Sequence, residues 1–138
     1  PYFTKETSKK LKTIIQSKTN LKEINIDIRD NPGGYLKDTI SSIDLFIKSG
    51  DIIQIKSRRG IKRYKATKTT HITSVPITIQ VNKNTASAAE IFAMVLKNQN
   101  RATIIGGEMY GKRTIQALFF LDEQNTKALK ITTSKFSL

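Results

Sequence analysis

The sequence predicts an α/β domain, because segments with helical spacing of apolar residues and segments with strand-like alternation follow one another along its 138 residues. Apolar residues make up 38% of the chain, which is enough to form a hydrophobic core. Short stretches rich in glycine, asparagine and proline separate the segments and indicate turns. Residues 1–138 are therefore expected to form one domain.

The first part of the chain predicts a helix, a strand and a second helix. Tyr2-Phe3 has the character of a strand end, and the spacing of apolar residues predicts a helix over 5–17. Alternation of isoleucine with polar residues predicts a strand over 24–28. A strong turn, Asn31-Pro32-Gly33-Gly34, leads into a second helix over 36–47 that is expected to end near Gly50.

The middle of the chain predicts three strands and a third helix. Residues 52–56 and 62–66 are expected to form a hairpin across Arg59-Gly60, and Pro76 precedes a clear strand over 77–81. Small and apolar residues over 87–96 have helical spacing.

The last part of the chain predicts strands joined by a flexible loop. A short strand is expected over 103–105, and glycines flank the loop over 106–111. Residues 114–121 and 128–133 then have the pattern of a closing strand pair. Both ends of the chain stop inside a pattern, so the domain is expected to be truncated at both ends.

The composition excludes several kinds of site. The chain contains no cysteine, which excludes disulfides, thiolate metal sites and a cysteine nucleophile. His71 is the single histidine and lies in a polar connection. A histidine in such a position is more often an exposed loop residue than a catalytic base. We therefore expect neither a metal site nor a cofactor.

The net charge of +13 raises the question of nucleic-acid binding. Only residues 56–68 form a dense basic stretch, and the remaining charges are scattered. We therefore expect no specific nucleic-acid partner, and at most a weak preference for acidic partners or peripheral association with an anionic membrane surface. The chain contains no run of 18 apolar residues, so the sequence predicts no transmembrane helix.

Three places combine residues suited to chemistry. Ser87 lies among small residues where a strand leads into a helix, so free backbone N–H groups near it can stabilise an oxyanion. The alternative is that Ser87 is only a helix cap, with Glu90 completing a capping box. Lys112 lies in a glycine-bounded loop, and a lysine acts as a general base only when burial lowers its pKa from about 10.4. Its alternative is a solvated surface charge.

The third place is the glycine pair Gly33-Gly34, where backbone N–H groups can approach a substrate closely. The alternative is an ordinary turn, which can have the same sequence.

Taken together, in their order along the chain, the three motifs resemble those of the carboxyl-terminal processing (tail-specific) peptidases. The matching pieces lie within residues 24–133 and include Ile26-Asp27-Ile28-Arg29-Asp30-Asn31-Pro32-Gly33-Gly34, Thr85-Ala86-Ser87-Ala88-Ala89-Glu90, and Tyr110-Gly111-Lys112 with Gln116.

The resemblance implies a serine endopeptidase that cleaves proteins near their carboxyl terminus. Ser87 would be the nucleophile, Lys112 the general base, and Gln116 the residue that holds the lysine amine. The amide of Ala88 and one glycine of the Gly33-Gly34 pair would form the oxyanion hole. The resemblance also implies that the domain folds as a ClpP/crotonase-like spiral of β-β-α units, and that a peptide-binding PDZ domain, which this chain lacks, is expected upstream. It further implies that substrates bind in an extended conformation and that the protein works outside the cytoplasm, for example in the bacterial periplasm.

Two positions depart from the family pattern. Asn98 stands where many members carry an acidic residue, and Arg113 replaces the small residue that usually follows the lysine. The alternative function is therefore a catalytically inactive peptide-binding module of the same fold. The presence of Ser87, Lys112 and Gln116 together favours the peptidase.

Overall fold

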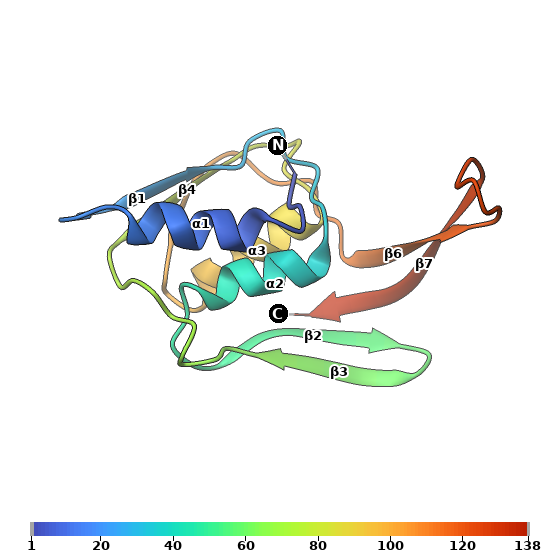
Figure 1. Cartoon of the computed structure of the whole chain (residues 1–138), viewed down its shortest axis with the longest axis horizontal. Helices are drawn as coiled ribbons and strands as arrows, with labels where there is room; N and C mark the ends of the chain where they lie inside the picture. The colour runs from blue at the N-terminus through green and yellow to red at the C-terminus, as the bar shows by residue number, and fades with distance from the viewer. Residues whose placement is uncertain (1, 138) are drawn as a thin grey trace.

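The computed structural model describes residues 2–137, which contain three helices and seven strands arranged in two sheets (Figure 1). In chain order the elements are α1 (Thr7–Gln16), β1 (Ile24–Asp27), α2 (Leu36–Asp44), β2 (Asp51–Ser57), β3 (Gly60–Lys65), β4 (Ile77–Val81), α3 (Ala88–Asn98), β5 (Thr103–Gly106), β6 (Thr114–Phe120) and β7 (Ala128–Ser137). The α/β class expected from the sequence is confirmed.

The first sheet is parallel and has the strand order β1-β4-β5. The central strand β4 pairs with both neighbours, with Ile79 opposite Ile26 on one side and Ile104 on the other. Ile77, Ile79 and Val81 of this strand are buried. Because the strands are parallel, their carboxyl ends meet at one edge of the sheet, which is where ligands bind in open α/β sheets.

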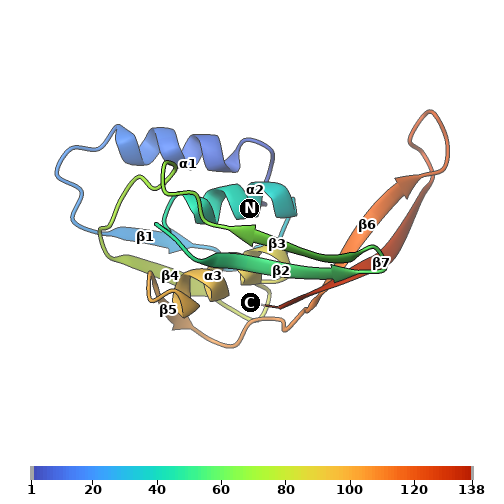
Figure 2. The ribbon, with the colours of Figure 1, turned by 90° about the horizontal axis from the view of Figure 1, so that it is seen from below.

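The second sheet is antiparallel and has the order β3-β2-β7-β6. It is built from two hairpins, β2–β3 and β6–β7, which join where β2 pairs with the end of β7. Figures 1 and 2 both show the β6–β7 hairpin projecting away from the rest of the molecule. The hairpin predicted across Arg59-Gly60 is confirmed.

The helices α2 and α3 pack against each other and lie between the parallel sheet and the β2–β3 hairpin (Figures 1 and 2). Phe92 of α3 is the centre of an aromatic cluster, with ring centroids 5.3 Å from Phe3 and 6.2 Å from Phe46. One hydrophobic core includes side chains from both sheets and all three helices. Each large apolar side chain buried here stabilises the fold by about 1.5–3 kcal/mol.

Two predicted boundaries are wrong, and both differences come from tertiary hydrogen bonds. The helix expected over 36–47 ends at Asp44, because the carbonyls of Leu45 and Phe46 accept hydrogen bonds from Ile72 N–H and the Arg101 side chain. The last strand continues to Ser137 instead of ending at residue 133, because its end pairs with β2.

The expectations at the chain ends have a mixed outcome. Phe3 forms an isolated parallel bridge with Gly34, as expected for the end of a strand. The predicted truncation rests on Pro1 and Leu138, which lie outside the described residues. No helix within residues 2–137 has the length and apolar character needed to cross a membrane.

Candidate active site

The candidate residues lie in the loops that follow the three parallel strands. Strand β1 leads into the turn with Gly33 and Gly34, β4 leads into the turn with Ser87, and β5 leads into the loop with Lys112. Since these strands end at the same edge of the sheet, segments about 55 and 80 residues apart in the sequence are brought together.

Ser87 has an unusual backbone conformation at the start of α3, with φ 56° and ψ −119°. A residue that serves only as a helix cap normally has an extended backbone, so capping does not require this conformation. Holding a non-glycine residue in such a sparsely populated region costs about 1–3 kcal/mol, and strain of this kind is concentrated at active sites. Ser87 is the N-cap of α3 and forms a capping box with Glu90, as the capping alternative expects, while its strained backbone is more than capping requires and suits a chemical role as well.

Glu90 joins the Ser87 turn to the Lys112 loop. Its side chain is 2% exposed, and its carboxylate accepts hydrogen bonds from the backbone N–H groups of Ser87 at 2.7 Å, Gly111 at 2.6 Å and Lys112 at 3.1 Å. A buried carboxylate is costly unless such charge-assisted bonds compensate for its lost hydration. The sequence indicated the bond to Ser87 as half of a capping box, but the two bonds to the lysine loop were missed.

The Lys112 loop is held more firmly than its glycine content suggests. Besides the two bonds to Glu90, Tyr110 N–H donates to the carbonyl of Thr85 at 3.0 Å. At the start of the loop Gly106 lies against β4, where an added Cβ would come within 2.1 Å of the Val81 carbonyl oxygen. The lysine is therefore presented by a fixed loop.

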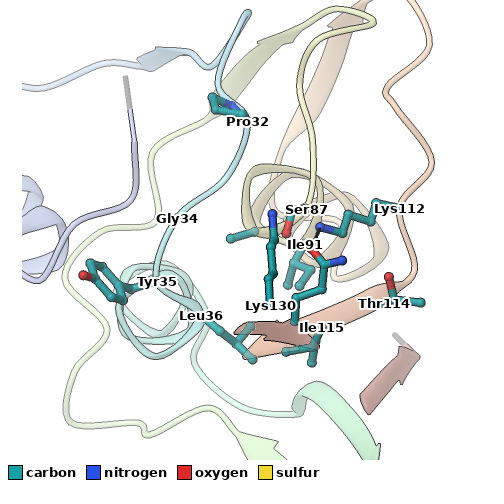
Figure 3. Close-up of a pocket in the computed structure, with 12 residues that line it drawn as sticks. Pro32, Gly34, Tyr35, Leu36, Ser87, Ile91, Lys112, Thr114, Ile115 and Lys130 are labelled. Atoms are coloured by element: carbon teal, nitrogen blue, oxygen red, sulfur yellow. Dashed lines mark hydrogen bonds between the residues drawn. The ribbon is translucent and has the colours of Figure 1, made fainter. Parts of the chain in front are cut away.

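Ser87 and Lys112 face the same groove. They line two adjoining cavities of about 310 and 490 Å³, which share Pro32, Thr114, Gln116 and Lys130; we call these cavities together the Ser87 groove (Figure 3). The half-buried Lys112 donates a hydrogen bond from its amine to Gln116 Oε1 at 2.9 Å. Among residues 2–137, no hydrogen bond joins the Lys112 amine to the Ser87 hydroxyl.

A bulge in β6 explains how neighbouring residues can line one groove. Consecutive residues of a regular strand point to opposite faces, yet Ile115 and Gln116 both line the 310 Å³ cavity of the Ser87 groove. The pairing of β6 with β7 shifts register between these two residues. Such a bulge redirects one side chain and places Gln116 beside Lys112.

The two glycines are not equivalent. Gly33 N–H donates to the side chain of Asn31 at 2.9 Å, whereas residues 2–137 provide no hydrogen-bond partner for Gly34 N–H. Gly34 and Ala88 both line the Ser87 groove. The amide of Ala88 is at the first helical position, where no carbonyl four residues earlier accepts its hydrogen. The structure thus offers the N–H groups of Ala88 and Gly34 as a pair of donors.

Gly33 holds the first turn close to the second. A Cβ atom at Gly33 would lie 3.0 Å from Ala88 N and from Ser87 Cβ. Its backbone has φ +114°, a conformation that side-chain-bearing residues rarely adopt. Glycine is therefore needed here for both its conformation and its close approach to Ser87.

A polar cluster fixes the two turns relative to each other. The Asp30 carboxylate accepts hydrogen bonds from the side-chain amides of Asn84 at 2.7 Å and Asn82 at 2.9 Å. In return, Asn82 Oδ1 accepts from Asp30 N–H at 3.0 Å. These bonds, from Asn84 first and Asn82 second, lower the pKa of Asp30 below its usual value against the opposing effect of burial.

His71 lies away from the Ser87 groove. It lines a separate cavity of about 390 Å³ together with Lys48, Ser74 and Arg101. Burial lowers the pKa of His71, and the positive charges of Lys48 and Arg101 lower it further. His71 lies in a loop, as expected, but it is half-buried rather than exposed.

The two departures from the family pattern lie outside the groove. Asn98 is exposed at the end of α3, and the side chain of Arg113 is exposed and does not line the Ser87 groove. The backbone carbonyl of Arg113 accepts a hydrogen bond from Phe136 N–H at 3.3 Å.

Comparisons with known proteins give a consistent result. The model of a family described as Peptidase family S41 matches residues 1–138. The carboxy-terminal-processing protease of Bartonella bacilliformis is 36% identical over 142 residues, which cover 97% of this chain and 32% of that protein. The carboxy-terminal processing protease CtpA of Bacillus subtilis is 36% identical over 138 residues, covering 97% of this chain and 29% of that protein.

Solved structures agree with the sequence comparison. The structure titled photosystem II D1 C-terminal processing protease matches with a TM-score of 0.82 at 27% identity, covering 99% of this chain and 36% of that chain. The chain thus spans about a third of the length of the relatives it matches.

Proposed function

Because the chain belongs to peptidase family S41, we propose that it supplies the catalytic serine and lysine of a serine peptidase that cleaves proteins near their carboxyl terminus. The observation that carries this proposal is the joint placement of Ser87 and Lys112. Ser87 has a strained backbone at the start of a helix, Lys112 faces the same groove, and the buried Glu90 binds the backbone of both residues.

The proposed reaction is acyl transfer followed by hydrolysis. The Ser87 hydroxyl oxygen attacks the substrate carbonyl carbon while the neutral amine of Lys112 accepts its proton. The carbonyl oxygen becomes an oxyanion, which the N–H groups of Ala88 and Gly34 stabilise. Lys112 then passes the proton to the leaving amine as the peptide bond breaks. Water next attacks the acyl-enzyme, Lys112 accepts a proton from it, and Ser87 regains its hydrogen as the new carboxylate leaves.

Gln116 serves the base rather than the substrate in this mechanism. Its side-chain oxygen accepts a hydrogen bond from the Lys112 amine, which fixes the direction in which the amine points. The proposal requires the lysine side chain to turn so that its amine reaches the Ser87 hydroxyl across the groove that both residues line. Hydrogen bonds of catalytic residues commonly shorten only when substrate is bound.

The substrate is expected to bind in an extended conformation beside β6. This strand is one of the two outer strands of the antiparallel sheet within the described residues, and its residues Thr114, Ile115 and Gln116 line the Ser87 groove. An outer strand has unpaired backbone groups that can add a peptide as a further strand. Following the resemblance of the sequence to its family, we place this activity outside the cytoplasm.

The inactive peptide-binding alternative has no support from the positions that prompted it. Arg113 and Asn98 are exposed, and neither of them lines the Ser87 groove. The residues needed for chemistry are present and face one another, so we retain the peptidase as the proposal.

Substitution of the two catalytic candidates in the full-length protein tests the proposal. Ser87→Ala should abolish peptide cleavage, and Lys112→Arg should do the same, because arginine stays protonated and cannot accept the serine proton. Ser74→Ala, at an exposed serine of the His71 cavity, is the matched control and should cleave normally. Circular dichroism would show that each variant folds. Turnover by a clean Ser87→Ala preparation would rule out the assignment of the nucleophile.

A further inference from the structure

A second lysine enters the Ser87 groove from the neighbouring strand. Lys130 of β7 pairs with Leu118 of β6, and Gln116 pairs with Thr132, so these four positions share one face of the β6–β7 hairpin. Lys130 lines both cavities of the groove together with Ser87 and Lys112. Figure 3 shows its side chain extending from the strand toward Ser87.

The amine of Lys130 has no partner among the described residues. It makes no hydrogen bond there, and the one ion pair within residues 2–137 joins Arg29 to Asp27. Within residues 2–137, no aspartate or glutamate lines the Ser87 groove. The nearby carboxylate of Glu90 is buried and already accepts three backbone N–H groups, so it does not neutralise this lysine.

One wall of the groove is apolar, and polar residues such as Thr114 and Gln116 line other parts of it. Leu36, Ile91 and Ile115 line the cavity that also contains Ser87. A cation beside an apolar surface at the reaction centre favours a ligand with matching parts, an apolar group and an adjacent anion. In the proposed mechanism Lys112 is the neutral base and its amine donates to Gln116, which leaves Lys130 as the charge available to a ligand.

We propose that Lys130 is a specificity-determining residue that binds a carboxylate of the substrate close to the scissile bond. This inference rests on the proposed peptidase function and adds the substrate class: peptides with an acidic group beside the cleaved bond. The carboxylate can come from an aspartate or glutamate side chain or from the free carboxyl terminus of a substrate cut close to its end. Both sources provide the same ligand chemistry.

The test uses the full-length protein and a neutral peptide whose cleaved bond has been located by mass spectrometry. Glutamate or glutamine is placed at each position within three residues of that bond, in peptides whose carboxyl terminus is amidated. A second set keeps glutamine at those positions and ends shortly after the bond with a free or an amidated terminus. The ratio of kcat/KM between acidic and neutral partners is measured for wild type, Lys130→Gln, Lys130→Arg and Lys135→Gln.

Lys130 is exposed, so we expect wild type to prefer the acidic partner in one of the two sets by about threefold to fivefold, as an exposed ion pair provides. The set that shows the preference identifies the source of the carboxylate. Lys130→Gln should bring the ratio close to one, and Lys130→Arg should largely retain it. Lys135 is an exposed lysine of the same strand that does not line the groove, so Lys135→Gln should leave the ratio and the rates unchanged.

Three results would overturn the inference: no preference in either set, a preference that survives in Lys130→Gln, or an equal fall in kcat/KM for acidic and neutral peptides. The last result would mean that Lys130 supports the chemistry or the fold.

If wild type cleaves none of the peptides, the proposed function fails separately from the inference about Lys130. Fluorescence anisotropy with the same peptides then measures the acidic-over-neutral ratio of binding to wild type and Lys130→Gln, and an unchanged ratio would still refute the role of Lys130.

Discussion

At the scale of single residues, Glu90 makes the largest difference to the site. A carboxylate has two oxygens that only accept hydrogen bonds, and here three backbone N–H groups from two separate loops donate to them. Neither loop alone would define the distance between Ser87 and Lys112. Glu90 is therefore a positioning residue, because it acts through the backbone of the groups that react.

Glu90→Gln is predicted to weaken both activity and stability. The amide keeps the shape but replaces one acceptor oxygen with an NH₂ group that faces backbone N–H donors, so the free energy of unfolding should fall by about 1–3 kcal/mol. The fall in kcat should exceed the change in KM, because the relative position of Ser87 and Lys112 is lost. Urea unfolding and peptide kinetics measure the two effects.

Glu108→Gln is the matched control, since Glu108 is an exposed glutamate of the same loop. It should leave both stability and kinetics close to wild type. A Glu90→Gln protein with normal kcat would contradict the positioning role, even if its stability were reduced.

Glycine substitutions separate backbone strain from steric contact. Gly60 has φ +112° and nothing within 4 Å of an added Cβ, whereas at Gly34, with φ +143°, the Cβ would lie 2.2 Å from the Phe3 carbonyl oxygen. Gly60→Ala should therefore lower the free energy of unfolding by about 1–3 kcal/mol through strain alone. Gly34→Ala should lower it more, because the backbone at Phe3 must also move. Equal losses in urea unfolding would show that the contact with Phe3 is relaxed at no cost.

At the scale of secondary-structure elements, the site is made by the turns that follow β1, β4 and β5. Each turn is anchored to another one: Asp30 to Asn82 and Asn84, Gly33 to Ser87, and Glu90 to the lysine loop. The strands set the distance between the turns, and the polar anchors set their orientation. The geometry of the groove therefore depends on contacts that span more than twenty residues of sequence.

The Asp30 anchor should respond to acid. Its lowered pKa means that the folded state holds the ionised form, so the stabilisation is present above the usual carboxyl pKa of about 3.9 and is lost as pH falls through the lower folded value. Asn84→Ala removes the largest cause and should raise the pKa of Asp30. A carboxyl NMR titration measures this change. Asn25→Ala, at an exposed asparagine outside the cluster, should not change it.

At the scale of the whole molecule, the β6–β7 hairpin differs from the rest of the fold. It carries Gln116 and Lys130 at its base, yet its apolar side chains are largely in contact with solvent. Leu118 is 55% exposed and Leu121 is 64% exposed. The members of this exposed set are Leu118, Phe119, Phe120, Leu121, Leu129 and Ile131. A strand pair that buries little apolar surface is held in place weakly.

The 138-residue chain by itself is therefore predicted to acylate slowly. Ser87 and Lys112 are not hydrogen-bonded, and Gln116, which orients the lysine, belongs to the weakly held hairpin. Displacement of a reacting group by about 1 Å can reduce a rate on the order of a hundredfold. Burst-phase acylation of Ser87 by an activated ester, compared between this chain and the full-length protein, measures the loss. Equal burst rates would show that the site needs no further support.

The sequence by itself determined the α/β class, nearly every helix and strand, and the three motifs at Gly33-Gly34, Ser87 and Lys112, because spacing, turn residues and helix starts are local properties. The catalytic roles assigned to these residues remain predictions from the family resemblance. Only the tertiary structure decided which of two glycines has a free N–H, where α2 ends, and that Glu90 binds the lysine loop. That Lys130 lines the groove without a partner among the described residues is likewise a tertiary fact. The physical reason is that hydrogen bonds and burial between distant segments depend on how strands pair and twist in space, which no local pattern of residues records.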